Sequence, residues 1–140
     1  MADKYYTASA AETEKVGAEF AARLAPGDFV ALYGELGAGK TALVRGMARV
    51  LAPGAAVSSP TYALVNVYEG EKCELCHFDM YRIHNEDDLY SIGFWDYDGC
   101  VFAVEWAENV PFALPDRYYA VAIAKTGEDG REITIEERGN

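Results

Sequence analysis

The sequence predicts an α/β protein with a central mixed β-sheet flanked by helices, folded as a single small domain. Three observations predict this fold class. An apolar run, Phe29–Tyr33, precedes a glycine-rich loop and an amphipathic helical pattern, so the order there is strand, loop, helix. Apolar segments on both sides of Glu69-Gly70-Glu71 indicate a hairpin, and therefore an antiparallel part of the sheet. The 140 residues have the length of one domain and contain no repeat and no long Pro/Gly linker.

The first predicted element is a helix that begins near Ser9. Ser9 and Glu12 have the spacing of a capping box, in which each side chain satisfies a free backbone N–H group of the first turn. Apolar residues then recur at helical spacing as far as Leu24, and Pro26-Gly27 ends the helix. The run Phe29–Tyr33 is continuously apolar, which is typical of a strand covered on both faces.

A second helix and the hairpin are predicted in the middle of the chain. Apolar residues keep a helical period over Leu43–Leu51, until Pro53-Gly54 interrupts it. The hairpin strands are Tyr62–Tyr68 and Lys72–Phe78. A short helix is expected over Asn85–Phe94, since acidic residues near its start suit the positive end of a helix.

The remaining strands are predicted toward the C-terminus. Cys100–Val104 is a second fully apolar strand. Tyr118–Ala124 and Arg131–Glu137 form a final hairpin around the turn Gly127-Glu128-Asp129-Gly130. Together with the strand that precedes the glycine loop, these segments give the mixed sheet.

Composition and charge limit the functions that this chain can have. Hydrophobic residues make up 51% of the chain, enough for a core, and the net charge is -11. Such a surface repels phosphate backbones, so we expect contact with nucleic acid only through a partner protein. No apolar run reaches the roughly 18 residues of a membrane span, and the first residues lack the apolar region of a signal peptide. Three cysteines, an odd number, argue against a set of disulfides and agree with a reducing compartment. Together these observations predict a cytoplasmic protein without membrane contact.

The glycine loop carries the clearest chemical signal. Gly34–Thr41 reads GELGAGKT and matches the phosphate-binding pattern G-x-x-x-x-G-K-[ST] in full. Glycines allow the backbone N–H groups to turn toward phosphate oxygens, and the following helix adds its free N–H groups and its positive end. Lys40 can reach the β- and γ-phosphates, and the Thr41 hydroxyl can bind Mg²⁺. The alternative is a glycine-rich turn without a ligand, which the preceding strand and the following helix argue against.

The predicted nucleotide site therefore begins in this loop. The residues expected to contact the nucleotide there are Gly37, Ala38, Gly39, Lys40, Thr41 and Ala42.

A site of this kind also needs a carboxylate at the end of a neighbouring strand, to hold Mg²⁺ or its waters. Glu105 follows four apolar strand residues, and Asp79 ends a hairpin strand. We assign the metal to Glu105 and a metal-bound or attacking water to Asp79, with a solvent-facing acid as the alternative for each. Thr61, in the loop SSPTY, is placed to sense the γ-phosphate or the metal, unless this is an ordinary loop. The predicted catalytic residues are thus Lys40, Asp79 and Glu105.

A cysteine-histidine segment and three arginines are further candidates for chemistry. Residues 73–77 read C-x-x-C-H, a haem-attachment pattern, but in a strand the two sulfurs would point to opposite faces. A phosphate-stabilising arginine could be Arg45, Arg49 or Arg82, and an arginine from a partner protein remains equally open.

The segments GELGAGKTALVRG, SSPTYALVNVY, HFDMYRI, LYSIGFWDY and VEWAE, in this order, resemble the bacterial TsaE family. The likeness runs from about Ser9 to Pro115. This family provides the P-loop ATPase of tRNA threonylcarbamoyladenosine (t6A) biosynthesis. The glycine loop by itself is generic, but the SPT, HFD-x-YR and VEW elements in that order are specific to the family.

The resemblance implies a small P-loop NTPase-like fold that binds ATP, releases ADP and uses Mg²⁺. It implies two partner proteins, a threonylcarbamoyl transferase subunit and its paralogue, with slow ATP hydrolysis alone and faster hydrolysis in the complex. The ATPase supports repeated turnover of the modification at adenosine 37, and tRNA is met only through the partners. By position, Lys40 and Thr41 match the phosphate and Mg²⁺ contacts, Asp79 the HFD aspartate and Glu105 the metal-linked glutamate.

The same motifs place Thr61 at the family's SPT threonine and Trp106 beside the glutamate. The segment Thr7–Ala10 falls where the family touches adenine, without a firm residue match.

Three other function classes share the glycine loop. A small-molecule kinase needs an acceptor pocket and usually an arginine-bearing lid, for which the sequence offers no candidate. A guanine-nucleotide switch needs an N-K-x-D element, which is missing. A nucleotide-gated assembly subunit with incidental hydrolysis would use all of the same residues and stays open.

Overall fold

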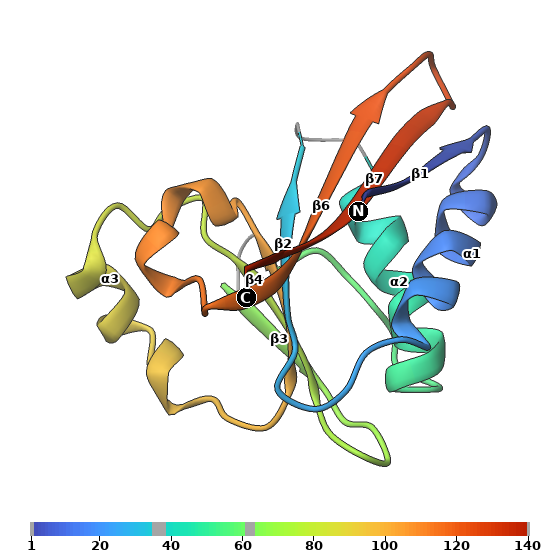
Figure 1. Cartoon of the computed structure of the whole chain (residues 1–140). Helices are drawn as coiled ribbons and strands as arrows, with labels where there is room; N and C mark the ends of the chain where they lie inside the picture. Colours follow the sequence, from blue (N-terminus) through green and yellow to red (C-terminus); the bar gives the residue numbers. More distant parts are fainter. Residues whose placement is uncertain (1, 35–38, 61–63, 140) are drawn as a thin grey trace.

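The computed structural model describes residues 2–34, 39–60 and 64–139 and contains a seven-stranded sheet with helices on both faces (Figure 1). The strands are β1 (Ala2–Thr7), β2 (Phe29–Tyr33), β3 (Val65–Tyr68), β4 (Leu75–Asp79), β5 (Val101–Glu105), β6 (Arg117–Lys125) and β7 (Arg131–Gly139). The α-helices are α1 (Ala10–Ala21), α2 (Lys40–Leu51) and α3 (Glu86–Ser91). Three 3₁₀ turns follow, η1 (Phe94–Asp96), η2 (Ala107–Asn109) and η3 (Pro111–Ala113). None of the helices within these ranges is long and apolar enough to cross a bilayer.

The sheet is mixed, as predicted. Its strand order is β1-β7-β6-β2-β5-β4-β3. The four central strands, β6, β2, β5 and β4, are parallel, and β3 on one side and β7 and β1 on the other run antiparallel to their neighbours. Because the carboxyl ends of parallel strands meet at one edge, residues that follow β2, β4 and β5 are brought together there.

Two apolar cores lie on opposite faces of the sheet. Alternation along β2 sends Val30 and Leu32 toward α1 and α2, and Phe29 and Ala31 toward the other side. Aromatic side chains dominate the second core, where Phe78 packs edge-on against Phe94. Figure 1 shows α1 and α2 together on one side of the sheet, and α3 with the short turns on the other. This double coverage explains why β2 is continuously apolar.

Helices α1 and α2 pack unusually close to each other. A Cβ atom built on Gly17 would lie 2.2 Å from the carbonyl oxygen of Leu43, and one on Gly46 would lie 1.8 Å from that of Glu14. Both glycines are buried, so backbone meets backbone at these two points. The contact fixes α2, the helix that follows the glycine loop.

The helix starts agree with the sequence. Ser9 caps α1 by accepting the N–H of Glu12 at 3.1 Å, and the Glu12 carboxylate accepts the N–H of Ala8 instead of the cap residue's own. Asn85 caps α3 by accepting the N–H of Asp88. Each α-helix lies where its pattern predicted it, with ends within a few residues.

One strand and several strand boundaries differ from the sequence prediction. Strand β1 was not predicted, because its sequence ADKYYT is largely polar and exposed, and its pairing partner β7 lies far along the chain. In the first hairpin β4 begins three residues later than predicted, so the connection spans residues 69–74 and Cys73 lies outside β4. Residues 62 and 63 of the first predicted hairpin strand lie outside the described ranges.

Candidate functional site

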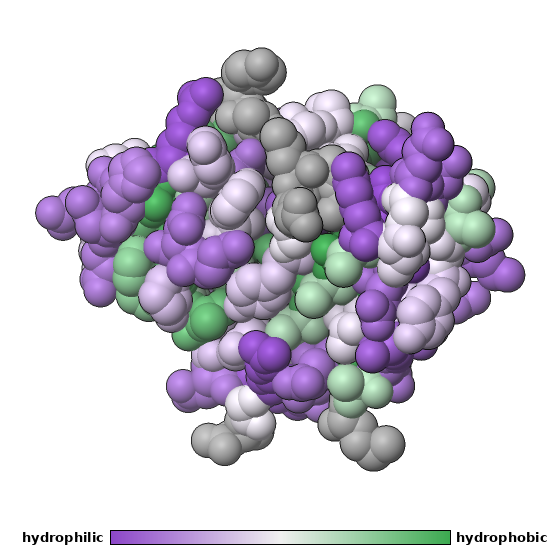
Figure 2. All heavy atoms as spheres, turned by 90° about the horizontal axis from the view of Figure 1, so that it is seen from above, coloured by the Kyte–Doolittle hydropathy of each residue, from purple (hydrophilic) through white to green (hydrophobic). Residues whose placement is uncertain are grey.

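The candidate site lies at the edge where β2, β5 and β4 end. Strand β5 runs between the other two, so its last residue, Glu105, is in register with Leu32 on one side and with Asp79 on the other. Figure 2 looks down on this end of the molecule, where hydrophilic residues cover both sides of the visible face. Helix α2 begins at the same edge with Lys40. The fold therefore gathers the predicted lysine and both predicted carboxylates in one place.

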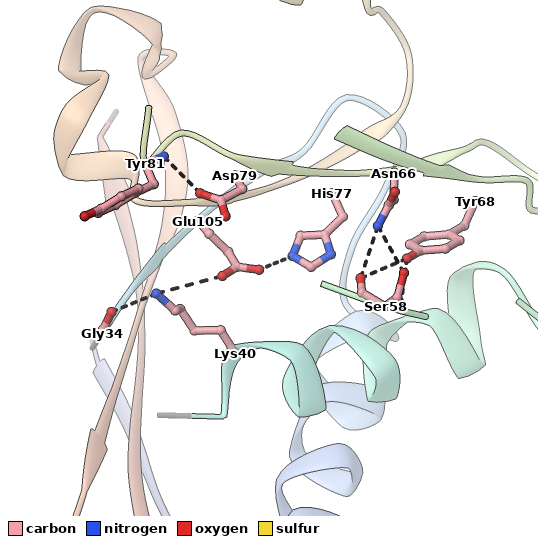
Figure 3. A network of polar contacts seen from close by, with 9 residues as sticks. All are labelled: Gly34, Lys40, Ser58, Asn66, Tyr68, His77, Asp79, Tyr81 and Glu105. Atoms are coloured by element: carbon pink, nitrogen blue, oxygen red, sulfur yellow. Dashed lines mark hydrogen bonds and ion pairs between the residues drawn. The ribbon is translucent and has the colours of Figure 1, made fainter. Parts of the chain in front are cut away.

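Lys40 is a buried cation with several partners. Only 5% of the residue is exposed, and its Nζ donates a hydrogen bond to the Gly34 carbonyl at 2.8 Å. The same Nζ lies 3.8 Å from Oε1 of Glu105 (Figure 3). It also lies 4.8 Å from the centre of the Trp106 ring. A carbonyl, a carboxylate and an aromatic face each stabilise the charge in a site that admits little water. The ammonium group is thus held at the end of β2, beside the start of the glycine loop.

Trp106 has a backbone conformation that few residues adopt. Its φ is 58°, in the left-handed region, directly after β5 ends. Its indole packs against the Tyr81 ring with centroids 4.9 Å apart. Such local strain is typical of functional sites, and the indole of this residue lies over the Lys40 ammonium.

The two carboxylates have different environments. Glu105 is 6% exposed, and its Oε2 lies 2.5 Å from Nε2 of His77, while Oε1 faces Lys40 (Figure 3). Asp79 accepts the backbone N–H of Tyr81 at 2.9 Å through Oδ1. The chain turn after β4 is tied to β5, because the N–H of Met80 donates to the Glu105 carbonyl. Both oxygens of Glu105 therefore face a described partner, whereas the described groups hold one oxygen of Asp79.

The start of α2 is arranged differently from the other two α-helix starts. Its cap residue, Gly39, has φ 104°, which only glycine adopts without strain, and no described side chain caps the helix. Thr41 and Ala42, in the first turn, are half-buried. The first backbone N–H groups are therefore available to an anion, which is the arrangement that the loop motif predicts.

The structure brings most of the predicted site residues together. Gly39, Lys40, Thr41, Ala42, Asp79 and Glu105 all lie at this edge of the sheet. Gly37, Ala38 and Thr61 lie outside the described residues. Ser58, in the same loop as Thr61, is held by two side chains of β3, since Asn66 Nδ2 donates to its carbonyl at 3.1 Å and the hydroxyl of Tyr68 does so at 3.3 Å.

Two of the three candidate arginines pair with a residue outside this site. Arg45 and Arg49 both pair with Glu14 of α1, at 3.6 and 2.6 Å. Arg82 is exposed on the turn after β4.

The three cysteines lie in or against the two apolar cores. Cys76 is fully buried in β4, and a hydrogen bond with Cys100, together with burial, raises the pKa of the Cys76 thiol far above its usual range. Cys73 is half-buried outside the strand. Among the described residues there is no cluster of three or more His, Cys, Asp or Glu side chains that could hold a metal ion.

Sequence reasoning missed two residues at the site. His77 was treated only as part of the C-x-x-C-H segment, yet it lies in β4 and contacts Glu105. The guanidinium of Arg131, the first residue of β7, approaches the loop, since a Cβ on Gly39 would lie 3.6 Å from its Nε. For His77 a local signal did exist, because it lies in a predicted strand two residues before Asp79. For Arg131 no local signal exists, because β7 lies far from the loop in sequence.

These features define a class of protein. A strand, a glycine loop and a helix whose first residue is lysine, with carboxylates on the neighbouring parallel strands, form a P-loop NTPase-like fold. The model of the family "Threonylcarbamoyl adenosine biosynthesis protein TsaE" matches residues 7–133. The chain belongs to the TsaE family, which confirms the resemblance seen in the sequence motifs.

Individual relatives agree. The TsaE protein of Bacillus subtilis is 34% identical over 137 residues, covering 98% of this chain and 87% of that protein. The TsaE protein of Treponema pallidum is 35% identical over 129 residues, covering 91% of this chain and 95% of that protein. The crystal structure of B. subtilis YdiB superposes with a TM-score of 0.80 at 31% identity, over 100% of this chain and 87% of that chain.

Proposed function

We propose that this protein binds and hydrolyses ATP as the ATPase subunit of t6A biosynthesis, and that it supports repeated turnover of the threonylcarbamoyl transferase. The observation that carries the proposal is the buried ion pair of Lys40 and Glu105 at the start of α2, in which Nζ lies 3.8 Å from Oε1. A lysine and a carboxylate in this position are the two charged groups that phosphate and its metal ion require.

Phosphate binding follows from the residues at the start of α2. The Lys40 ammonium carries the positive charge, and the uncapped first turn offers N–H groups that point in the same direction. Because Lys40 already has a carbonyl and a carboxylate as partners, it is oriented before a ligand arrives. Preorganised donors of this kind stabilise charge that develops on phosphate oxygens during transfer.

The described residues also fit a magnesium ion that arrives with the nucleotide. Lys40, Glu105 and Asp79 together carry one excess negative charge, and Mg²⁺ in nucleotide sites usually takes one or two carboxylates plus phosphate oxygens. In this proposal the Thr41 hydroxyl and Glu105 hold the ion, directly or through water. When bound, Mg²⁺ would neutralise charge on the phosphates. Asp79 orients a water molecule, since one of its oxygens is fixed by Tyr81 and the other accepts no hydrogen bond from the residues that the structure describes.

The biological role rests on the family. The relatives in Bacillus and Treponema are named as tRNA threonylcarbamoyladenosine biosynthesis proteins. With a net charge of -11, this chain is expected to meet tRNA only through the transferase subunit and its paralogue. A role in tRNA modification agrees with the cytoplasmic location that the sequence predicts.

Reconstitution tests the proposal. Transferase, paralogue, tRNA, ATP, threonine and bicarbonate are combined with or without this chain. The expected result is many rounds of modification per transferase with the chain present, and about one round without it. Equal multi-round yields in both mixtures would refute the proposed role.

One variant separates hydrolysis from gating. Asp79→Asn keeps an acceptor for the Tyr81 N–H group and removes the negative charge. If this variant assembles with the partners but fails to support repeated rounds, hydrolysis is required. If repeated rounds continue, the protein acts as a nucleotide-gated assembly subunit.

A further inference from the structure

His77 is a buried imidazole for which the proposed reaction has no direct use. It lies in the middle of β4 with no exposed surface, and its cross-strand neighbours are Asn66 on β3 and Ala103 on β5. Its other neighbours in β4, Leu75, Cys76 and Phe78, are also completely buried. A polar ring at this position is costly unless a partner compensates for lost water.

That partner is Glu105. Nε2 of His77 lies 2.5 Å from Oε2 of the carboxylate, whereas Nδ1 is buried and has no hydrogen-bond partner among the described residues. A carboxylate can only accept, so the hydrogen of the neutral ring must be on Nε2. The opposite tautomer would leave a buried N–H group unsatisfied at Nδ1 and set two acceptors against each other.

The hydrogen bond fixes the direction of the carboxylate. With Oε2 held by His77, Oε1 is turned toward Nζ of Lys40, 3.8 Å away, at the start of α2 (Figure 3). Without the imidazole, the Lys40 ammonium would be the one described partner left to limit rotation of the carboxylate about its last torsion. Polar residues behind a metal ligand commonly orient it in this way.

We propose that His77 is a positioning residue that orients Glu105 for the magnesium ion of bound ATP. The inference rests on the proposed function, because it takes Glu105 as the residue that holds the metal. The inference assigns His77 no contact with nucleotide or metal. Because the Gly34 carbonyl still holds Lys40, replacing His77 should act mainly on the magnesium-dependent part of binding.

Substitution of His77 tests this separation. His77→Leu removes the donor and keeps an apolar side chain, and His77→Gln can still donate an N–H group from a similar position. The dissociation constant of ATP is measured by calorimetry in Mg²⁺ and in EDTA. We expect His77→Leu to lower the magnesium-dependent gain in affinity about 10-fold and His77→Gln to restore most of it, with affinities in EDTA nearly unchanged. The exposed His84→Gln is the matched control and should behave as the wild type.

The outcomes distinguish this inference from the proposed function. If the wild type binds no ATP in either buffer, the proposed function fails and the inference fails with it. If the wild type binds ATP and His77→Leu folds with an undiminished magnesium effect, the inference alone is overturned.

A second measurement covers the case in which His77→Leu does not fold. The chain has two histidines, so the imidazole nitrogen spectrum of the wild type can be assigned with His84→Gln. The inference requires a slowly exchanging hydrogen on Nε2 of His77 and a bare Nδ1. A hydrogen on Nδ1, or rapid exchange of both positions with solvent, would overturn it.

Discussion

Replacing Gly46 by alanine tests how α2 is held in place. The added Cβ would lie 1.8 Å from the carbonyl oxygen and 2.6 Å from the carbonyl carbon of Glu14, both backbone atoms of α1. Side chains cannot relieve this clash by rotating, so the two helix backbones must separate by roughly 1 Å or more.

The magnitude follows from two opposing effects. In an open helix, alanine is more stable than glycine by about 1 kcal/mol. Forcing apart a packed interface costs about 3 kcal/mol, the upper part of the range for overpacking, because only backbone can move. We therefore expect the free energy of unfolding to fall by about 2 kcal/mol, equivalent to a Tm lower by about 4–8 °C. ATP affinity should fall as well, since α2 carries Lys40.

Urea and thermal unfolding followed by circular dichroism measure the effect. The matched control is Gly127→Ala in the β6–β7 turn, where an added Cβ meets nothing within 4 Å and stability should change little. The sign of the change in the free energy of unfolding is the test. A Gly46→Ala protein as stable as the wild type, or more stable, would refute the close approach of α1 and α2.

Other substitutions test the site and the core. Lys40→Met removes a charged hydrogen-bond donor worth about 1.5–3 kcal/mol, so calorimetry should show ATP binding about 10- to 100-fold weaker, and an affinity within twofold of the wild type would contradict the role of Lys40. Asp79→Asn should retain ATP affinity while phosphate release with the partners falls about 100-fold or more, and unchanged release would remove Asp79 from the reaction. In the native protein a thiol reagent at pH 8 should label Cys73 well before Cys76, because Cys76 is buried and its hydrogen bond with Cys100, together with burial, raises its pKa far above the usual range. Equal labelling rates for Cys73 and Cys76 before unfolding would contradict the burial of Cys76 beside Cys100.

The part of the fold that could be predicted from sequence is the part with local signals. The apolar run of β2, the glycine loop and the helical period of α2 are contiguous, and each carries its own pattern. The strand-end positions of Asp79 and Glu105 were also readable, because apolar residues precede each of them. Parallel pairing of β4 with β5 then places the two carboxylates side by side.

What could not be predicted depends on distant pairings. Strand β1 forms only because β7 offers a free edge, and its own sequence has the polar character of an exposed edge strand. The contact of His77 with Glu105 joins residues 28 positions apart, and the approach of Arg131 to Gly39 joins more distant ones. Neither contact changes the local pattern of apolar and polar residues, so neither could be predicted without the folded structure.

Titration of isotope-labelled wild-type protein with ATP, first in EDTA and then with Mg²⁺, is the most direct test of the site. We predict that ATP shifts the backbone amide signals of Gly39, Lys40 and Thr41 and raises the Tm, and that Mg²⁺ then shifts signals around Glu105. A nucleotide at 100 times its dissociation constant should stabilise the protein by about 2.7 kcal/mol. Spectra and melting curves that millimolar ATP leaves unchanged, with and without Mg²⁺, would contradict phosphate binding at the start of α2.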